Sequence, residues 1–272
     1  MNRIEKLFSA RQKNILNVYC TAGYPQLNST AEVLLALQQH GADMVEIGIP
    51  YSDPLADGPV IQESNMAALK NGMSIQKLFD QLRNLRTPVT PSGDGDSGGR
   101  SQSDFRLPLI LMGYLNPVMQ YGFEKFCTDA KCVGVDGIIL PDLPLYEFET
   151  EYKQIFKQND LDFIFLITPE TSVERIKKID ELTSGFIYAV SSSSTTGKDT
   201  NLILQQTYFQ KLQQLKLKNP VLVGFGIKDK QTFQVACQFT NGAIIGSAFI
   251  KALQNSNDIN ASTEQFLNKI LK

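Results

Sequence analysis

Short apolar segments alternate with amphipathic ones along this whole chain of 272 residues. Apolar runs without a polar face are typical of strands buried on both sides of a parallel sheet. We predict strands over residues 14–21, 44–49, 107–112, 135–140, 163–168, 185–190, 220–223 and 242–245. Amphipathic helical segments follow them, one opening at the capping box Ser29-Thr30-Ala31-Glu32. Eight strand–helix units in a chain of this length predict one domain over residues 1–272, a (β/α)8 TIM barrel with a short N-terminal helix.

Residues 89–106 interrupt this alternation with a run of Gly, Ser, Asp, Pro and Thr. Such a composition buries too little apolar surface to offset the entropy lost on ordering the chain. We therefore predict a disordered insertion between the second helical region and the third strand. A helix-to-strand connection in this barrel lies opposite the catalytic loops, so we expect the insertion to have no catalytic role.

Charge and composition exclude several classes of function. A net charge of -2 with both signs scattered indicates no surface for nucleic acid or for an anionic membrane. No apolar run reaches the roughly 20 residues of a spanning helix, and the N-terminus lacks the apolar core of a signal peptide. The four dispersed cysteines are expected to be reduced, which suits a cytoplasm or a plastid stroma and not secretion.

Two acidic residues stand out around the second predicted strand. Alternation along residues 44–49 places Met44, Glu46 and Gly48 on one face, which sends a carboxylate inward from an otherwise apolar strand. A second acid, Asp57, follows in a loop stiffened by prolines. Singly, Glu46 would more often be an ion-paired residue and Asp57 a turn former. Together, at the end of a barrel strand, they are suited to general acid–base chemistry.

Small residues follow the last three predicted strands. Glycines let backbone N–H groups approach an anion, and a helix opening at Ser247 would direct its positive end toward it. This position is the usual phosphate seat of such barrels. Any one of these glycines alone would more often be a turn residue, but their shared register in the barrel favours phosphate binding. The residues of this expected site are Thr196, Gly197, Gly224, Phe225, Gly226, Gly246 and Ser247.

The stretch from Glu46 to Pro59 reads E-x-G-x-P-x-S-D-P-x-A-D-G-P. This pattern strongly resembles the signature of the tryptophan synthase alpha subunit family, and the resemblance extends along nearly the whole chain. It implies a carbon–carbon lyase that cleaves indole-3-glycerol phosphate to indole and glyceraldehyde 3-phosphate by a retro-aldol reaction. It also implies a beta subunit that receives the indole, in an alpha2–beta2 heterotetramer.

The residues suggest how such a reaction would proceed without a cofactor. No Lys lies in a predicted strand to form a Schiff base, and His40 is the only histidine, so no metal site is expected. Indole protonated at C3 can itself accept the electrons of the breaking bond. By resemblance, Glu46 protonates that carbon and takes the proton of the glycerol hydroxyl, while Asp57 accepts the indole N–H.

The resemblance assigns further residues. Tyr188 matches an active-site tyrosine, although an aromatic residue of the core is an equal alternative from the sequence itself. Tyr19 and Ile61 match positions lining the indole pocket, and Asp142 matches an aspartate that steadies the loop bearing Asp57. Residues 191–197 depart from the family pattern S-x-x-G-V-T-G, because Ser194 replaces its first glycine. This departure puts the closure of that loop in doubt, and not the reaction.

Three functional hypotheses remain open at this point. The first is the lyase working with a beta subunit, docked on the prolines of the Asp57 loop and on Asn116-Pro117. The second is a stand-alone lyase that releases free indole. The third is a catalytically silent subunit that only activates beta, against which the presence of both Glu46 and Asp57 argues.

Overall fold

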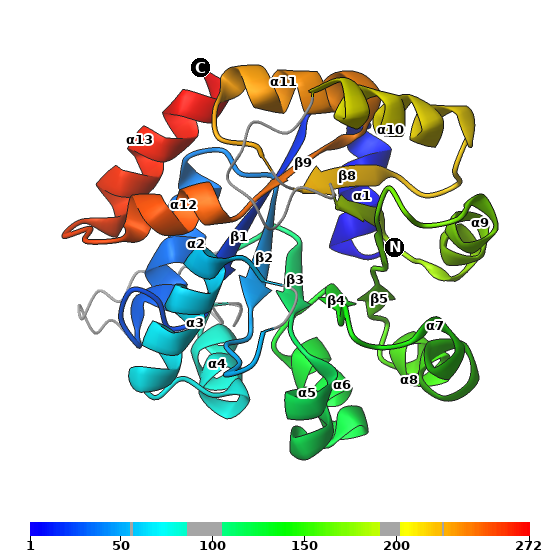
Figure 1. Ribbon diagram of the computed structural model, residues 1–272. Coiled ribbons are helices and arrows are strands. Elements are labelled where there is room, and N and C mark those ends of the chain that lie inside the picture. The colour runs from blue at the N-terminus through cyan, green and yellow to red at the C-terminus, as the bar shows by residue number, and fades with distance from the viewer. Residues whose placement is uncertain (55–56, 86–104, 191–201, 225) are drawn as a thin grey trace, which may run out of the picture.

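The computed structural model describes residues 1–54, 57–85, 105–190, 202–224 and 226–272, with residues 202–206 described by their backbone. Its parallel strands form one curled sheet in the order β5-β4-β3-β2-β1-β9-β8-β7-β6, surrounded by helices (Figure 1). The strands are β1 (Ile15–Thr21), β2 (Met44–Gly48), β3 (Leu109–Met112), β4 (Gly137–Ile139), β5 (Asp162–Phe163), β6 (Leu166–Ile167), β7 (Ile187–Val190), β8 (Val221–Gly224) and β9 (Gly242–Ile245).

The fifth predicted strand, residues 163–168, is divided into β5 and β6. The first piece pairs with β4 and the second with β7. Between them, the Ile164 N–H donates to the carbonyl of Ile138, and the carbonyl of Phe165 accepts from the Tyr188 N–H. The two pieces thus act as one strand whose halves join opposite ends of the sheet, which gives the eight-unit barrel that the sequence predicts.

Helices cover the outside of this sheet and one end of the barrel (Figure 1). They are α1 (Arg3–Ala10), α2 (Ser29–Gln39), α3 (Pro59–Lys70), α4 (Ile75–Arg83), α5 (Leu115–Tyr121), α6 (Phe123–Cys132), α7 (Leu145–Glu147), the π-helical turn η1 (Phe148–Tyr152), α8 (Lys153–Gln158), α9 (Val173–Leu182), α10 (Leu202–Gln214), α11 (Lys230–Phe239), α12 (Ser247–Leu253) and α13 (Ile259–Leu271). None of the helices in the described ranges has the length and apolar composition needed to cross a membrane.

Two separate apolar clusters form the core. The larger lies between the sheet and the outer helices and includes Val45 and Ile47 of β2. The smaller fills the barrel interior and includes Met44 of β2 and Leu222 of β8. Alternate residues of one strand therefore enter different layers, as the strand period of two requires.

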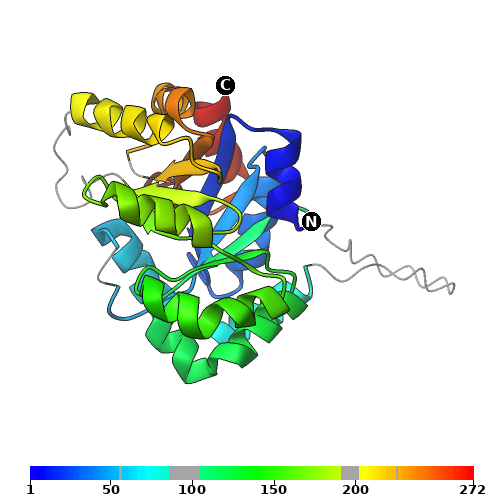
Figure 2. The same cartoon turned by 90° about the vertical axis from the view of Figure 1, so that its right-hand side faces the viewer.

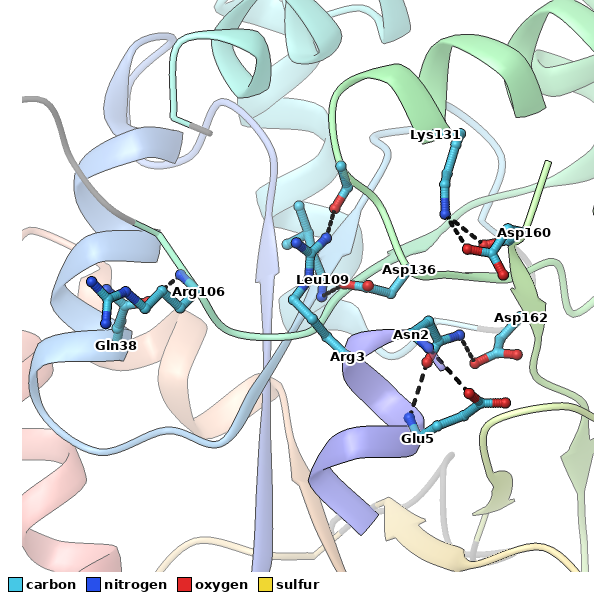
Figure 3. Close-up of polar contacts among 11 residues, drawn as sticks. Asn2, Arg3, Glu5, Gln38, Arg106, Leu109, Lys131, Asp136, Asp160 and Asp162 are labelled. Atoms are coloured by element: carbon cyan, nitrogen blue, oxygen red, sulfur yellow. Dashed lines mark hydrogen bonds and ion pairs between the residues drawn. The ribbon is translucent and has the colours of Figure 1, made fainter. Parts of the chain in front are cut away.

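Helix α1 closes the N-terminal end of the barrel (Figure 2). Its Ile4 and Phe8 belong to the interior cluster. Figure 3 shows Asn2 and Arg3 reaching the strands that they cover: Asn2 Nδ2 donates to Asp162 Oδ2 at 2.6 Å, and Arg3 Nε pairs with Asp136 Oδ2 at 3.0 Å. The interior is therefore plugged at this end, which leaves the C-terminal ends of the strands as the face open to a ligand.

The predicted insertion falls almost entirely outside the described residues, since positions 89–104 are not among them. Its last two residues are described, and they belong to the folded barrel. Phe105 is 4% exposed in the outer apolar cluster, and the Arg106 N–H donates to Gln38 Oε1. The folded segment thus begins inside the predicted range, because Phe105 is apolar enough to join the core.

Candidate active site

Glu46 lies in the middle of the barrel wall, on the inward face of β2. It is 1% exposed, and its partner across the ladder with β1 is Tyr19. Its neighbour two residues earlier, Met44, enters the interior apolar cluster. The predicted inward direction of Glu46 is therefore confirmed.

Burial controls the chemistry of this carboxyl. Removal from water raises the pKa of Glu46 to about 8, and the negative charge of Asp57 also acts to raise it. The hydrogen bond from Asn17 acts in the opposite direction, because its Nδ2 donates to Glu46 Oε2 at 3.1 Å. At neutral pH Glu46 is accordingly a protonated acid.

Asp57 lies immediately before Gly58, the residue that caps α3. Burial raises the pKa of its carboxyl to about 6, while hydrogen bonds from Tyr114 and Asn65 lower it. The Asn65 bond is long, at 3.4 Å between Nδ2 and Oδ2. Because its pKa stays below neutrality, Asp57 is ionised at a pH where Glu46 is still protonated.

Two tyrosines complete the polar lining of the interior. Burial, together with the carboxylates of Asp57 and Glu46, raises the pKa of Tyr19 on β1 and of Tyr188 on β7 well above the usual value. Both hydroxyls therefore remain protonated. Both tyrosines interact electrostatically with both acids. The structure therefore brings together Glu46, Asp57, Tyr19 and Tyr188, all of which the sequence singles out.

Glycines make room for these tyrosine rings. A Cβ at Gly48 would lie 1.9 Å from Tyr19 Oη, and one at Gly224 would lie 2.3 Å from Tyr188 Cε2. A Cβ at Gly246 would lie 3.4 Å from Tyr19 Cβ, which is an ordinary contact distance. Of the predicted phosphate-binding glycines, Gly224 therefore also makes room for the ring of Tyr188, whereas the space at Gly246 would admit a Cβ.

The predicted phosphate residues that are described lie at the ends of adjacent strands. Gly224 ends β8, and its ladder partner on β9 is Ile244, two residues before Gly246. Gly246 caps α12, whose first residue, Ser247, is exposed. Gly226 is exposed and has a φ of +73°, a conformation that favours glycine. Thr196, Gly197 and Phe225 lie outside the described residues.

The remaining two predicted residues are Ile61 and Asp142. Ile61 is half-buried in the first turn of α3. The carboxylate of Asp142 accepts from the Leu115 N–H, at 2.9 Å to Oδ1 and 3.0 Å to Oδ2. It thereby fixes the residue next to Tyr114, which hydrogen-bonds to Asp57.

Sequence reasoning missed three residues that hold the acids, namely Asn17, Asn65 and Tyr114. A signal for Asn17 was present, because an amide stands alone in a strand of apolar residues two positions before Tyr19. The other two carried no such signal. An Asn on a helix and a Tyr after a strand are ordinary residues until the loop of Asp57 is placed against them.

The arrangement can carry out proton transfer in a site that is buried from solvent. It combines a buried acid, a carboxylate and two neutral hydroxyls, and its pKa values are separated by burial as in other acid–base pairs. The glycine ends of β8 and β9 lie on the same face of the barrel and can receive an anion.

Comparison with known proteins agrees with this geometry. Residues 6–271 match the family model described as tryptophan synthase alpha chain. The tryptophan synthase alpha chain of Parabacteroides distasonis is 51% identical over 100% of this chain and 98% of its own length, and that of Flavobacterium johnsoniae is 48% identical over 99% and 100%. A crystal structure of the alpha subunit from Legionella pneumophila superposes with a TM-score of 0.83 at 33% identity, covering 99% of this chain and 97% of the other. The chain therefore belongs to the tryptophan synthase alpha chain family.

Proposed function

We propose that this chain is the alpha subunit of a tryptophan synthase and that Glu46, Asp57 and Tyr188 carry out its carbon–carbon lyase reaction. Glu46 protonates C3 of the indole ring of indole-3-glycerol phosphate. The electron pair of the breaking C–C bond then moves into the ring and neutralises its nitrogen. The glycerol hydroxyl gives its proton back to Glu46 as it becomes the aldehyde, so that indole and glyceraldehyde 3-phosphate leave and Glu46 is restored.

The observation that carries this proposal is the difference in protonation between the two acids. A pKa of about 8 supplies the proton donor, and a pKa of about 6 supplies a charged acceptor for the indole N–H. Neither role needs a metal or a bound cofactor, because the indole ring is the electron sink. The neutral Tyr188 hydroxyl interacts electrostatically with both acids, and it can donate a hydrogen bond to the glycerol oxygen.

The rest of the proposed site binds the substrate. Tyr19 and Ile61 flank the indole, and Asp142 supports the Asp57 loop through Leu115 and Tyr114. The phosphate is held by backbone N–H groups and a hydroxyl. These groups come from Thr196, Gly197, Gly224, Phe225, Gly226, Gly246 and Ser247.

A beta subunit is the partner that we propose for this chain. The loop after β2 and helix α5 border a groove of about 600 Å³, which includes Pro50, Asn116 and Pro117. These are residues of the docking face expected from the resemblance. A heterotetramer of two alpha and two beta chains would deliver indole directly to the second active site. The relatives named above are bacterial, which supports a cytoplasm as the compartment and gives no support to a plastid.

Indole release from indole-3-glycerol phosphate tests the proposed reaction. The wild type, Glu46→Gln and Asp136→Asn are compared, with and without a beta subunit. We expect Glu46→Gln to lose about 10³-fold or more in kcat, since one residue serves as acid and base. Asp136→Asn, which changes another buried acid at the opposite end of the barrel, should keep its kcat. Equal activity of the wild type and Glu46→Gln would contradict the assignment.

The same assay separates the other two hypotheses. Full turnover without beta would favour a stand-alone lyase that releases free indole. Activation of beta by a wild type that releases no indole would instead indicate a silent subunit.

A further inference from the structure

Asn17 is a buried polar side chain to which the proposed reaction gives no step. It lies on the inward face of β1, is 0% exposed, and has Met44 of β2 and Ile244 of β9 as its ladder partners. An amide among apolar side chains is costly unless it is hydrogen-bonded. Its place in the barrel therefore depends on the bond that it makes.

That bond is made to the proposed catalytic acid. Asn17 Nδ2 donates to Glu46 Oε2 at 3.1 Å. Among the described residues, Asn17 is the one side-chain hydrogen-bond partner of the Glu46 carboxyl. The titratable groups whose charges are coupled to that of Glu46 are Tyr19 and Cys20 on β1, Asp57 in the loop after β2, and Tyr188 on β7. All four are acids and cannot neutralise a carboxylate, so Asn17 is the group that orients and stabilises it.

The other end of the amide is also informative. Asn17 Oδ1 is buried, and it has no hydrogen-bond partner in the part of the chain that the structure describes. An Asn side chain is a donor at one end and an acceptor at the other, with nearly equal shape. Half a turn of the amide would therefore place Oδ1 against Glu46, where it could accept the O–H of the protonated acid.

We propose that Asn17 is a positioning residue that holds the Glu46 carboxyl in place in both of its protonation states. Its NH2 group donates to the carboxylate, and its oxygen accepts from the acid after the amide rotates. The inference rests on the proposed function, in which Glu46 gives up and regains one proton in each turnover. A single side chain that serves both states keeps the carboxyl directed at the substrate throughout.

Direct titration of Glu46 tests the contact without substrate. The carbonyl stretch of the protonated acid is followed by infrared difference spectroscopy and assigned with Glu46→Gln. Asn17→Leu removes both hydrogen bonds at similar shape. Because the bond to the charged carboxylate is the stronger of the two, its loss should raise the pKa of Glu46 by about one unit. Thr263→Val, which removes a buried hydroxyl in α13 on the outside of the barrel, should leave it unchanged. An unchanged or lowered pKa in Asn17→Leu would overturn the proposal.

A second variant guards against failure of Asn17→Leu to fold. Asn17→Asp has the same shape but replaces the donor with another acid. The pKa of Glu46 should rise in this variant as well, because two adjacent carboxyls resist double ionisation. Retention of the wild-type value would again overturn the proposal.

The kinetic readout separates positioning from a merely structural role. In Asn17→Leu we expect kcat to fall by about tenfold to a hundredfold while KM stays within about threefold. The reason is that the acid loses its orientation, whereas the substrate keeps its contacts. The alkaline limb of the kcat/KM profile should move up with the Glu46 pKa, while the acid limb stays in place. A wild type without indole release would contradict the proposed function, whereas the titration would still decide whether Asn17 holds Glu46.

Discussion

Gly48 and Gly224 act at the scale of single atoms, since each leaves space that a tyrosine ring fills. In Gly48→Ala the new methyl group would lie 1.9 Å from Tyr19 Oη, a distance that no side chain can accept. We expect displacement of Tyr19 and a fall of at least about tenfold in kcat/KM, measured as indole release. Gly58→Ala is the matched control, because its methyl group would meet no atom of the described residues within 4 Å. Equal losses in both variants would contradict the explanation.

The two acids predict a bell-shaped dependence of kcat/KM on pH. Below pH of about 6, Asp57 takes up a proton and its charge no longer stabilises the indole N–H. Above pH of about 8, Glu46 loses the proton that it must donate. Activity should therefore be highest between these values, and the limbs report the pair of acids together. A profile measured across both limbs that rises steadily through the pKa of Glu46 would show that this acid starts the reaction ionised.

How far single residues could be predicted depended on how much their chemistry stands out locally. Glu46 was predictable because a carboxylate in an apolar strand is conspicuous, and alternation fixes the face on which it lies. Tyr114 was not, because its role comes from a loop that folds back from elsewhere in the chain. Asn17 could have been chosen by the same argument as Glu46, as an amide in an apolar strand.

At the scale of elements, helix α1 acts as a plug held by ion pairs and hydrogen bonds. Asp136 is buried and accepts from Arg3 Nε at 3.0 Å and from the Leu109 N–H at 2.9 Å. Asp136→Asn keeps an acceptor for Leu109 but loses the ion pair with Arg3. We expect a loss of about 1–3 kcal/mol in the free energy of unfolding, measured by urea denaturation, and no change in kcat.

The control for this prediction is Arg3→Gln, which breaks the same ion pair from the more exposed side. It should cost less, because the guanidinium is already partly hydrated and Asp136 keeps the Leu109 N–H as a donor. A fall in kcat in either variant would contradict this prediction, because it would mean that a change at the N-terminal end of the barrel alters the active site at the C-terminal end.

Element boundaries were less predictable than element types. Eight strand–helix units follow from periodicity, but the division of residues 162–167 into β5 and β6 arises from pairing with two different neighbours. The capping box at Ser29 was also wrong in detail. Helix α2 does begin at Ser29, but Asn28 is its cap and makes no side-chain capping bond, while Ser29 Oγ accepts from the Gln26 N–H. A capping pattern cannot tell these neighbouring arrangements apart.

At the scale of the whole molecule, the residues that stabilise the barrel and those of the candidate active site lie at opposite ends of its axis. The N-terminal end holds α1 and its ion pair, whereas the C-terminal end holds Asp57 and the glycines after β8 and β9. This division could be predicted from the fold, since parallel strands place all their C-terminal ends on one face. Which partners hold the acids could not, because they come from β1, α3 and the segment after β3.

The position of the predicted insertion relative to this division leads to the last prediction. The described residues on either side of positions 86–104 are Leu85, just after α4, and Phe105, before β3, and both are buried in the outer apolar cluster. Arg106 is tied to Gln38 of α2, as Figure 3 shows, and β3 starts only at Leu109. The segment therefore enters the barrel at the N-terminal end of β3, opposite the face that carries Asp57.

Deletion of residues 91–104 should leave kcat and KM for indole-3-glycerol phosphate within about twofold of the full chain. Shortening a connection changes its closure entropy only slowly, so the urea midpoint should move little. The matched comparison is Phe105→Ala in the full chain, which should lower stability by about 3–5 kcal/mol, because it empties a buried site without shortening the segment. Loss of activity in a deletion variant that keeps its stability would place this segment beside the active site, and the two ends of the barrel would then not be independent.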